Sequence, residues 1–451
     1  MTAKAELLTL EKSGLVSVAA YQPELEYLFR HALVQDAAYD SLLKQDRRSL
    51  HKLAAENLLS LYPERRRELA GVVGMHFERA GDPASAAEQF VIAGEHALER
   101  FAQREGVSFF ARATELMPAD DPRADLRLRA AIGSARAGWT FAGLGGALDQ
   151  LAKAIALAED RADRRILADA YFWEAFLGAG VMFNGDLRQG AKLLSEALEE
   201  LEGKADVMSS SVLSGFLAIT YARLGEFDAA ERALSRAERL AAQGDEIARL
   251  DSQISRSALD LERGDIAEGS ARAQHCAETS ETLGAVACAV ASNVFLGQAR
   301  LTLEDTHGAR APLERGVELS LVTYMAPMRT LAKGMLGTVR ARLGDLPAGD
   351  AGWNDALAAA RAGGDRFGEA VTLWGRGRTH GRQTAPDWDA ALSDLDAALA
   401  LFEGMEARPS IARTLRDRAY VLRALGHEDR AAQDDARSRA IAAEIGLKDF
   451  S

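Results

Sequence analysis

A recurring spacing of small residues constrains this chain more than any other feature of its sequence. Within residues 218–237, small residues stand at Ala218, Ala230 and Ala237, and a large one stands at Leu234. The same offsets recur along the chain with a period of 39 to 43 residues. Small residues at fixed helical offsets let two antiparallel helices approach closely, so the pattern predicts stacked helix pairs. The first small position of each repeat is assigned to Ala135, Gly178, Ala218, Ser257, Gly297, Gly337, Thr379 and Ala419.

We therefore expect an all-α fold: a right-handed superhelical solenoid of tetratricopeptide-like helix pairs with a period of about 40 residues, preceded by a partial winged-helix segment. The offsets resemble those of the tetratricopeptide repeat, although that repeat has a shorter period. The additional residues in each repeat of this chain are expected to lengthen the helices or the turns between them. A repeat array grows without adding cores, so the length of 451 residues reflects the number of repeats more than the number of domains.

The composition excludes several classes of function. A formal net charge of −13 argues against a nucleic-acid surface, because phosphate binding needs an excess of Lys and Arg. The longest apolar run, residues 285–291, is too short to cross a membrane, and no signal peptide is recognisable. Cys276 and Cys288 lack the neighbours of a zinc or redox motif and are expected to be reduced packing residues. We expect a cytoplasmic protein without cofactors.

The first part of the chain does not follow the repeat. A helical pattern over residues 5–12 is followed by a hairpin pattern around Pro23, and helical patterns return over 33–43 and 47–61. This order matches the second half of a winged-helix domain. The predicted domains are a partial winged helix at 1–64, helical junction repeats at 65–122 and the superhelix at 123–451.

Four segments in the first part of the chain carry a recognisable pattern: YLFRHALVQDAAYDSLL at 27–43, RRSLH at 47–51, MHFERAGD at 75–82 and AGE at 93–95. They resemble segments of one family of proteins, the large bacterial signalling ATPases of the STAND type, which include adenylate-cyclase-like and maltose-activator-like members. The resemblance covers roughly residues 5 to 118. In that family a sensor or cyclase domain, a P-loop ATPase module and a winged helix precede a helical-repeat region.

The catalytic parts of that family are not found in this sequence. No Gly-rich loop ends in Lys and Ser or Thr, and the residues 143–146, which are rich in glycine, lack the lysine. There is also no metal-ligand motif and no nucleophile elbow. The resemblance implies one inherited site: His31 would sense the bound nucleotide in a full-length parent, as a winged-helix histidine does in related switch proteins. The alternative is a histidine satisfied locally at the end of a strand.

The inner groove of such a superhelix is lined by the first helix of each pair, so fixed offsets from the small residue predict the groove residues. An apolar stretch is predicted from Ile254, Leu261, Val294 and Leu301. A basic wall near the C-terminus is predicted from Arg376, His380, Arg413, Arg416, Tyr420 and Arg423. A local basic wall in an acidic protein steers acidic ligands to one place. The alternative is that these arginines pair with Asp387, Asp389, Asp394 and Asp417 or are solvated.

These patterns favour a non-catalytic regulatory or protein-interaction module, the ligand-sensing helical-repeat region of a signalling ATPase. The expected partner is a protein or peptide with an acidic segment, or a small anionic inducer, and neither nucleic acid nor a membrane. A second interpretation is an autonomous tetratricopeptide scaffold that organises other proteins. A third is an enzyme whose chemistry no local motif reveals.

Overall fold

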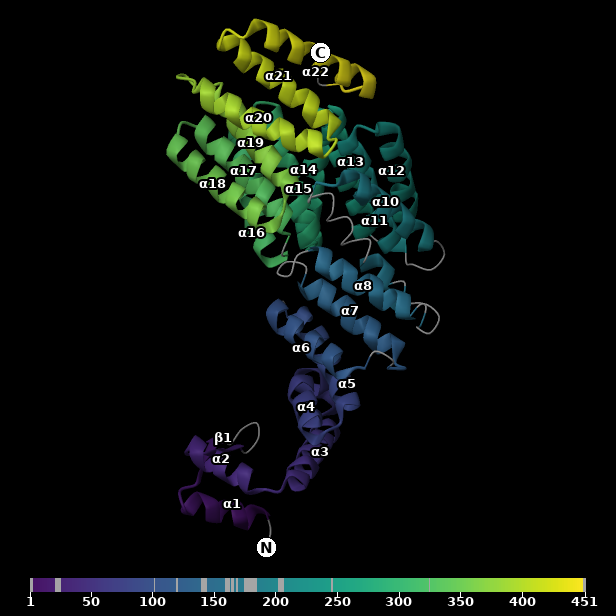
Figure 1. Cartoon of the computed structure of the whole chain (residues 1–451), viewed down its shortest axis with the longest axis vertical. Helices are drawn as coiled ribbons and strands as arrows, with labels where there is room; N and C mark the ends of the chain where they lie inside the picture. The colour runs from purple at the N-terminus through teal and green to yellow at the C-terminus, as the bar shows by residue number, and fades with distance from the viewer. Residues whose placement is uncertain are drawn as a thin grey trace. The chain divides into compact units, whose positions relative to one another are not determined.

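The structure is a computed structural model of the 451-residue chain, and it is helical almost throughout (Figure 1). It forms two compact units, Met1–Pro122 and Arg123–Ser451. The residues that it describes are 3–20, 26–100, 102–118, 121–138, 144–158, 163, 166–167, 169–173, 185–201, 207–244, 246–323 and 325–448.

The first unit begins with a helix and a two-stranded hairpin and continues as helices. The strands pair antiparallel, with Val16 opposite Phe29 and Val18 opposite Tyr27. Its elements are α1 (Ala3–Lys12), β1 (Val16–Ala20), β2 (Glu26–Phe29), α2 (Ala32–Ser41), α3 (Lys44–Leu61), the short 3-10 helix η1 (Pro63–Arg65), α4 (Arg66–Ala80), α5 (Pro83–Glu99) and α6 (Gln103–Leu116).

Helices α3 to α6 pack one against the next, and glycines allow the close approach. A Cβ atom at Gly74 would lie 2.9 Å from the ring of Phe90, and one at Gly94 would lie 2.7 Å from the ring of Phe110. No other residue type fits at these two positions without movement of a ring. The packing is continuous from α3 into α4, across residue 64.

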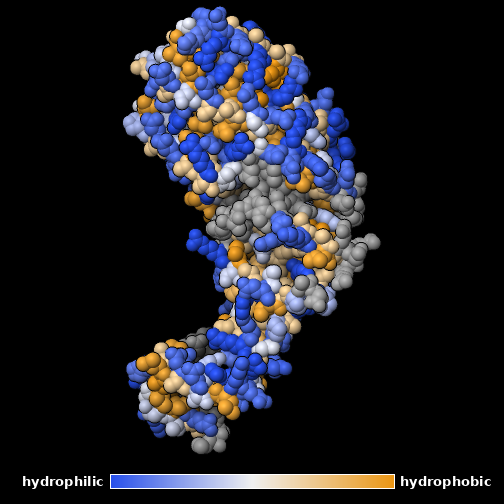
Figure 2. All heavy atoms as spheres, in the orientation of Figure 1, coloured by the Kyte–Doolittle hydropathy of each residue, from blue (hydrophilic) through white to orange (hydrophobic). Residues whose placement is uncertain are grey.

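Large apolar side chains are exposed in the part of this unit that precedes α3. Leu28 in β2, Leu33 in α2 and Leu43 after α2 are 61%, 82% and 72% exposed. Figure 2 shows apolar groups gathered at this end of the chain. Helix α2 buries none of its residues. This segment therefore contributes little to the core of the unit.

The second unit is a solenoid of helix pairs. We call α7, α11, α13, α15, α17, α19 and α21 the first helices and the helix after each of them the second helix. The elements are α7 (Ala124–Gly138), α8 (Leu144–Ala158), α10 (Leu187–Glu200), α11 (Val207–Leu224), α12 (Phe227–Ala241), α13 (Glu246–Arg263), α14 (Ile266–Leu283), α15 (Val286–Thr302), α16 (Thr306–Thr323), α17 (Ala326–Arg342), α18 (Leu346–Gly363), α19 (Arg366–His380), α20 (Trp388–Gly404), α21 (Arg408–Ala424) and α22 (Glu428–Ile445).

The small residues predicted from the sequence lie where the two helices of a pair meet. A Cβ atom at Gly297 would lie 2.4 Å from Leu313 of the second helix, and one at Gly337 would lie 2.6 Å from the indole of Trp353. Each small residue is the twelfth residue of its helix in α7, α11, α13, α15, α17 and α21. Gly178, assigned to the same column, lies outside the described residues. The all-α solenoid is thus the observed fold.

The assignment of Thr379 to this column is wrong by two residues. The twelfth residue of α19 is Gly377, whose Cβ would lie 3.0 Å from the carbonyl of Ala391 and from Leu395. The turn between α19 and α20 spans residues 381–387, which is longer than the corresponding turns of the other pairs. The longer turn adds two residues between the small positions and shifts the register of that repeat.

The last helix pair of unit 2 also contacts its early helices. The guanidinium of Arg413 in α21 donates to the carbonyls of Leu261 and Glu262 in α13, at 3.2 and 3.0 Å. Beyond α22, the backbone N–H of Lys448 donates to the carbonyl of Arg263 at 2.9 Å, and its ammonium pairs with Asp265. The superhelix therefore closes on itself within the unit.

Among the described residues, one helix, α11, is long and apolar enough to cross a membrane. Within it, 61% of the residues are buried, and α10, α12 and α13 pack against it. A helix that is apolar on all sides is expected at the centre of a large packed protein. Its apolar character is accounted for by this packing.

Candidate functional site

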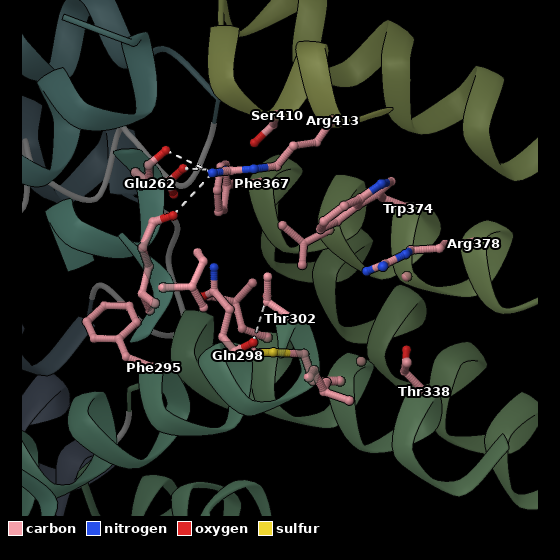
Figure 3. A pocket seen from close by; sticks show the side chains of 18 of the residues that line it. Glu262, Phe295, Gln298, Thr302, Thr338, Phe367, Trp374, Arg378, Ser410 and Arg413 are labelled. Atoms are coloured by element: carbon pink, nitrogen blue, oxygen red, sulfur yellow. Dashed lines mark hydrogen bonds and ion pairs between the residues drawn. The ribbon is translucent and has the colours of Figure 1, made fainter. Parts of the chain in front are cut away.

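A cavity of about 280 Å³ lies on the inner surface of unit 2. It is lined almost entirely by the first helices α11, α13, α15, α17, α19 and α21. Figure 3 shows side chains from several of these helices converging on it, among them Phe295, Trp374 and Arg413. Because α21 closes on α13, helices that are far apart in the sequence form opposite walls.

The wall of the cavity combines an apolar part with a basic part, a composition suited to a ligand with both characters. Among the described residues that line it, Glu262 is the single acidic one. The basic residues are Arg223, Arg342, Arg378, Arg413 and Arg416. The main apolar residues are Ile219, Leu261, Phe295, Leu301, Leu331, Met335, Phe367, Val371 and Trp374.

Arg223 lies deep in this wall and is 4% exposed. Its guanidinium carbon lies 3.8 Å from the centre of the Phe367 ring, and its Nε lies 4.0 Å from the carboxylate of Glu262. Burial lowers the pKa of Arg223, and the carboxylates of Glu262 and Asp365 oppose that shift. Arginine retains its charge even so. The cavity therefore holds a buried positive charge stacked on an aromatic ring.

Arg413 and Arg416 place two further guanidinium groups on the wall formed by α21. Besides its two bonds to backbone carbonyls, Arg413 lies 3.6 Å from the carboxylate of Glu262 (Figure 3). Glu262 thus faces Arg223 and Arg413 from α13. Five arginines and one carboxylate line the described part of the cavity, so its wall is basic.

Arg342 and Arg378 supply the basic residues at the rim. Arg378 donates to Glu304 at 2.9 Å, and Arg342 lies 3.4 Å from the same carboxylate. Burial lowers the pKa of Arg342, and the positive charge of Arg378 beside it adds to the shift. Trp374 donates from its indole nitrogen to Asp417 at 2.9 Å, which fixes the ring that lines the cavity. The rim is therefore a cluster of like charges held by two carboxylates.

Of the residues predicted for the groove, Leu261, Leu301, Arg413 and Arg416 line this cavity. Ile254 and Val294 are buried in the core, at 5% and 0% exposed. Neither is among the lining residues that the structure describes. Val294 lies against the second helix α16, where a Cβ atom at Gly316 would be 3.1 Å from it.

The remaining residues predicted for the basic wall lie elsewhere, and of these Arg376 pairs with an aspartate named in the alternative. Arg376 makes two hydrogen bonds to Asp394 of α20, at 2.6 and 2.7 Å. His380 packs on Trp353 with the ring centres 5.5 Å apart, Tyr420 packs on Trp388 at 6.0 Å, and Arg423 pairs with Asp435 and Glu428. These four residues are absent from the described lining of the cavity.

The corrected register explains which residues the sequence analysis missed. Counted from Gly377, the four offsets used for the groove give Val371, Trp374, Arg378 and Gly381, and the first three of these line the cavity. Two more arginines, Arg223 and Arg342, stand five residues after the small residue, a position not included in the prediction. That position lies four residues after the one that directly follows the small residue, which places both on the same helix face.

His31 follows β2 and is the residue immediately before α2. Its side chain is exposed and makes no capping hydrogen bond. It lies in unit 1, whereas the cavity lies in unit 2.

Metal and thiol chemistry find little support in the described part of the chain. It contains no group of three or more His, Cys, Asp and Glu residues that could hold a metal ion. Burial raises the pKa of Cys276 to about 11 and that of Cys288 to about 12. The reactive form of cysteine is the thiolate, and the raised pKa keeps both side chains in the thiol form near neutral pH. Neither thiol is therefore activated.

No family model and no curated protein matches this chain. A Rap protein complexed with competence and sporulation factor is 13% identical with a TM-score of 0.55, over 80% of this chain and 98% of that one. The Rap conjugation gene regulator of plasmid pLS20 in complex with a Phr peptide is 10% identical with a TM-score of 0.52, over 80% and 96%. A STAND protein with a tetratricopeptide repeat sensor from Pyrococcus horikoshii is 13% identical with a TM-score of 0.40, over 99% of this chain and 60% of that one. The first two share the helical-repeat fold with this chain.

Proposed function

We propose that unit 2 is a non-catalytic regulatory module that binds a protein or peptide segment in the cavity of its inner surface. The observation that carries the proposal is the wall of this cavity, where five arginines adjoin an apolar surface. Apolar side chains of a ligand fit the surface around Phe295 and Leu301, and a carboxylate fits the arginines. An acidic peptide segment and a small anionic inducer both satisfy this chemistry.

The similar solved structures support a peptide over other ligands. One of them is a complex of a Rap regulator with a Phr peptide, so a helical-repeat protein of this fold can bind a peptide. At 10% identity no binding residue is transferred from it. The proposal for this chain rests on its own cavity.

The test uses labelled hexapeptides of apolar residues that end in a free carboxylate, titrated with the full chain and followed by fluorescence anisotropy. Arg416→Glu reverses a charge on the cavity wall and is expected to weaken binding at least about tenfold, or about 1.4 kcal/mol. Arg423→Glu on the same helix changes the net charge equally outside the cavity and is the matched control. Binding should weaken with salt in the wild type. Equal effects of the two variants, or no binding by the wild type, would refute the proposal.

We further propose that this module is the sensing region of a cytoplasmic signalling ATPase, with residues 1–64 as part of its winged helix and 65–122 as junction repeats. The resemblance of residues 5–118 to that family and the order of helix, hairpin and helices support this. The exposed Leu28, Leu33 and Leu43 are also expected where a segment packs against further protein. In such a parent His31 would sense the nucleotide. Nucleotide-dependent activity of the parent that His31→Ala leaves unchanged would exclude that role.

A further inference from the structure

One turn in the solenoid breaks a pattern that its neighbours share. The turn between first and second helix has a glycine with positive φ at Gly225, Gly264, Gly344 and Gly426, with φ between 78° and 97°. The corresponding residue after α15 is Glu304, with φ 61°. In all five turns the next residue donates its backbone N–H to the carbonyl five residues before it, as Asp305 does to Arg300 at 2.8 Å, so the backbone requires the left-handed conformation there. A glutamate adopts it at a free-energy cost that glycine does not have.

The side chain of Glu304 lies among three arginines. Its carboxylate accepts a hydrogen bond from Arg378 at 2.9 Å and lies 3.4 Å from Arg342 and 3.6 Å from Arg382. Arg342 and Arg378 line the cavity, and so does Leu303, which directly precedes the glutamate. Glu304 is 59% exposed and therefore stands at the rim, where it can leave the arginines for solvent.

A second carboxylate holds these arginines in place but does not neutralise them. Asp417 is 4% exposed, accepts from Arg382 at 3.1 Å and from Trp374, and lies 3.7 Å from the Nε of Arg378. Among the described residues that buried Nε has no hydrogen-bond partner. Without Glu304, three positive charges would face a single carboxylate and would bind another anion.

We propose that Arg342, Arg378 and Arg382 form a carboxylate-binding site at the rim of the cavity, and that Glu304 occupies it until the carboxylate of a ligand displaces it. The inference rests on the proposed peptide-binding function and names the group that is recognised. Asp417 remains in place, because it is buried and bonded to Trp374. Glu304 thus lowers the affinity for every anionic ligand and makes binding depend on the additional apolar contacts.

The experiment uses benzoate as the probe, a carboxylate with an apolar ring, and measures its affinity for the full chain by calorimetry. Glu304→Gln removes the competing charge, and Glu304→Gly also relieves the backbone. Both are expected to bind benzoate about tenfold more tightly than the wild type, since the competitor contacts three arginines. Glu318→Gln, which removes an exposed carboxylate of α16, is the control for net charge and should match the wild type. Adding Arg378→Gln to Glu304→Gln should abolish the increase in benzoate affinity.

A further probe decides the chemistry. Benzamide lacks the charge and should not bind. The inference is wrong if the Glu304 variants bind benzoate like the wild type, or if benzamide binds equally. Hexapeptides that bind as proposed alongside an unchanged benzoate affinity would refute this site alone. A benzoate response as expected without any hexapeptide binding would instead refute the peptide-binding function.

Discussion

Two histidines in the first unit share a hydrogen bond that is lost when both rings are protonated. His51 and His76 lie with their Nδ1 atoms 2.8 Å apart, and the hydroxyl of Tyr39 lies 3.0 Å from the Nε2 of His51. Burial lowers the pKa of both histidines, and the charge of Arg79 adds to the shift. One nitrogen must accept, so the pair cannot be doubly protonated and remain bonded.

We predict that the contact between α3 and α4 weakens in acid. Because the folded pKa of each histidine lies below its unfolded value of 6.5, its contribution to stability is present above that pH and is lost as the pH falls through the folded pKa. Protection factors of the α3 and α4 amides in hydrogen exchange should fall between neutral pH and pH values below 6.5. His76→Gln should flatten this dependence. Equal pH profiles for the two proteins would contradict the assignment.

The sequence analysis predicted only some of the arginines that line the cavity. Arg413 and Arg416 were found because their repeat has the ordinary spacing. Arg378 was missed through the longer turn after α19, and Arg223 and Arg342 because the offsets stopped one residue short. A local pattern identifies the residues on one face of a helix. An insertion in a turn changes which residue numbers occupy that face, and a fixed spacing does not detect the insertion.

At the scale of helix pairs, the small residues are predicted to lie where the two helices of a pair pack closely. We predict that Ala230→Leu costs on the order of 1 to 3 kcal/mol, because Ala230 is fully buried where α12 meets α11. Arg232→Leu on the exposed side of α12 should cost little and is the control. Glu231 would be a poor control, since it pairs with Arg256 and Arg263. Similar melting temperatures for the two variants would contradict the alignment of the repeats.

The last helix pair does more than end the array. Helix α22 has a polar sequence, yet Asp434 within it is buried in an ion pair with Arg418. The contacts of Arg413 and Lys448 with α13 and the turn after it were not predictable. They depend on the accumulated rotation of successive pairs, which a local spacing does not determine.

We therefore predict that deletion of residues 409–451 does more than shorten the array. The truncation exposes Leu395 and Leu399 on α20 and removes the contact between α21 and α13. The melting temperature should fall and the protein should self-associate, because a new apolar face meets water. Sedimentation and thermal unfolding measure both effects. A monomer with an unchanged melting temperature would show that this pair is dispensable.

At the scale of the whole molecule, the account rests on one arrangement: first helices that form a closed inner surface with a basic, partly apolar cavity. The fold class followed from the spacing of small residues alone. The position of the cavity did not, because it depends on the closure of α21 onto α13. The basic character of its wall was anticipated only in part, through Arg413 and Arg416.

The most direct measurement of the central claim is hydrogen exchange of the full chain with and without the labelled hexapeptides. Added protection is predicted in the first helices α13, α15, α17, α19 and α21 near the cavity, with little change in the second helices that face outward. The protection should be reduced in Arg416→Glu and kept in Arg423→Glu. Protection confined to unit 1 or to the second helices, or none at all, would contradict the account.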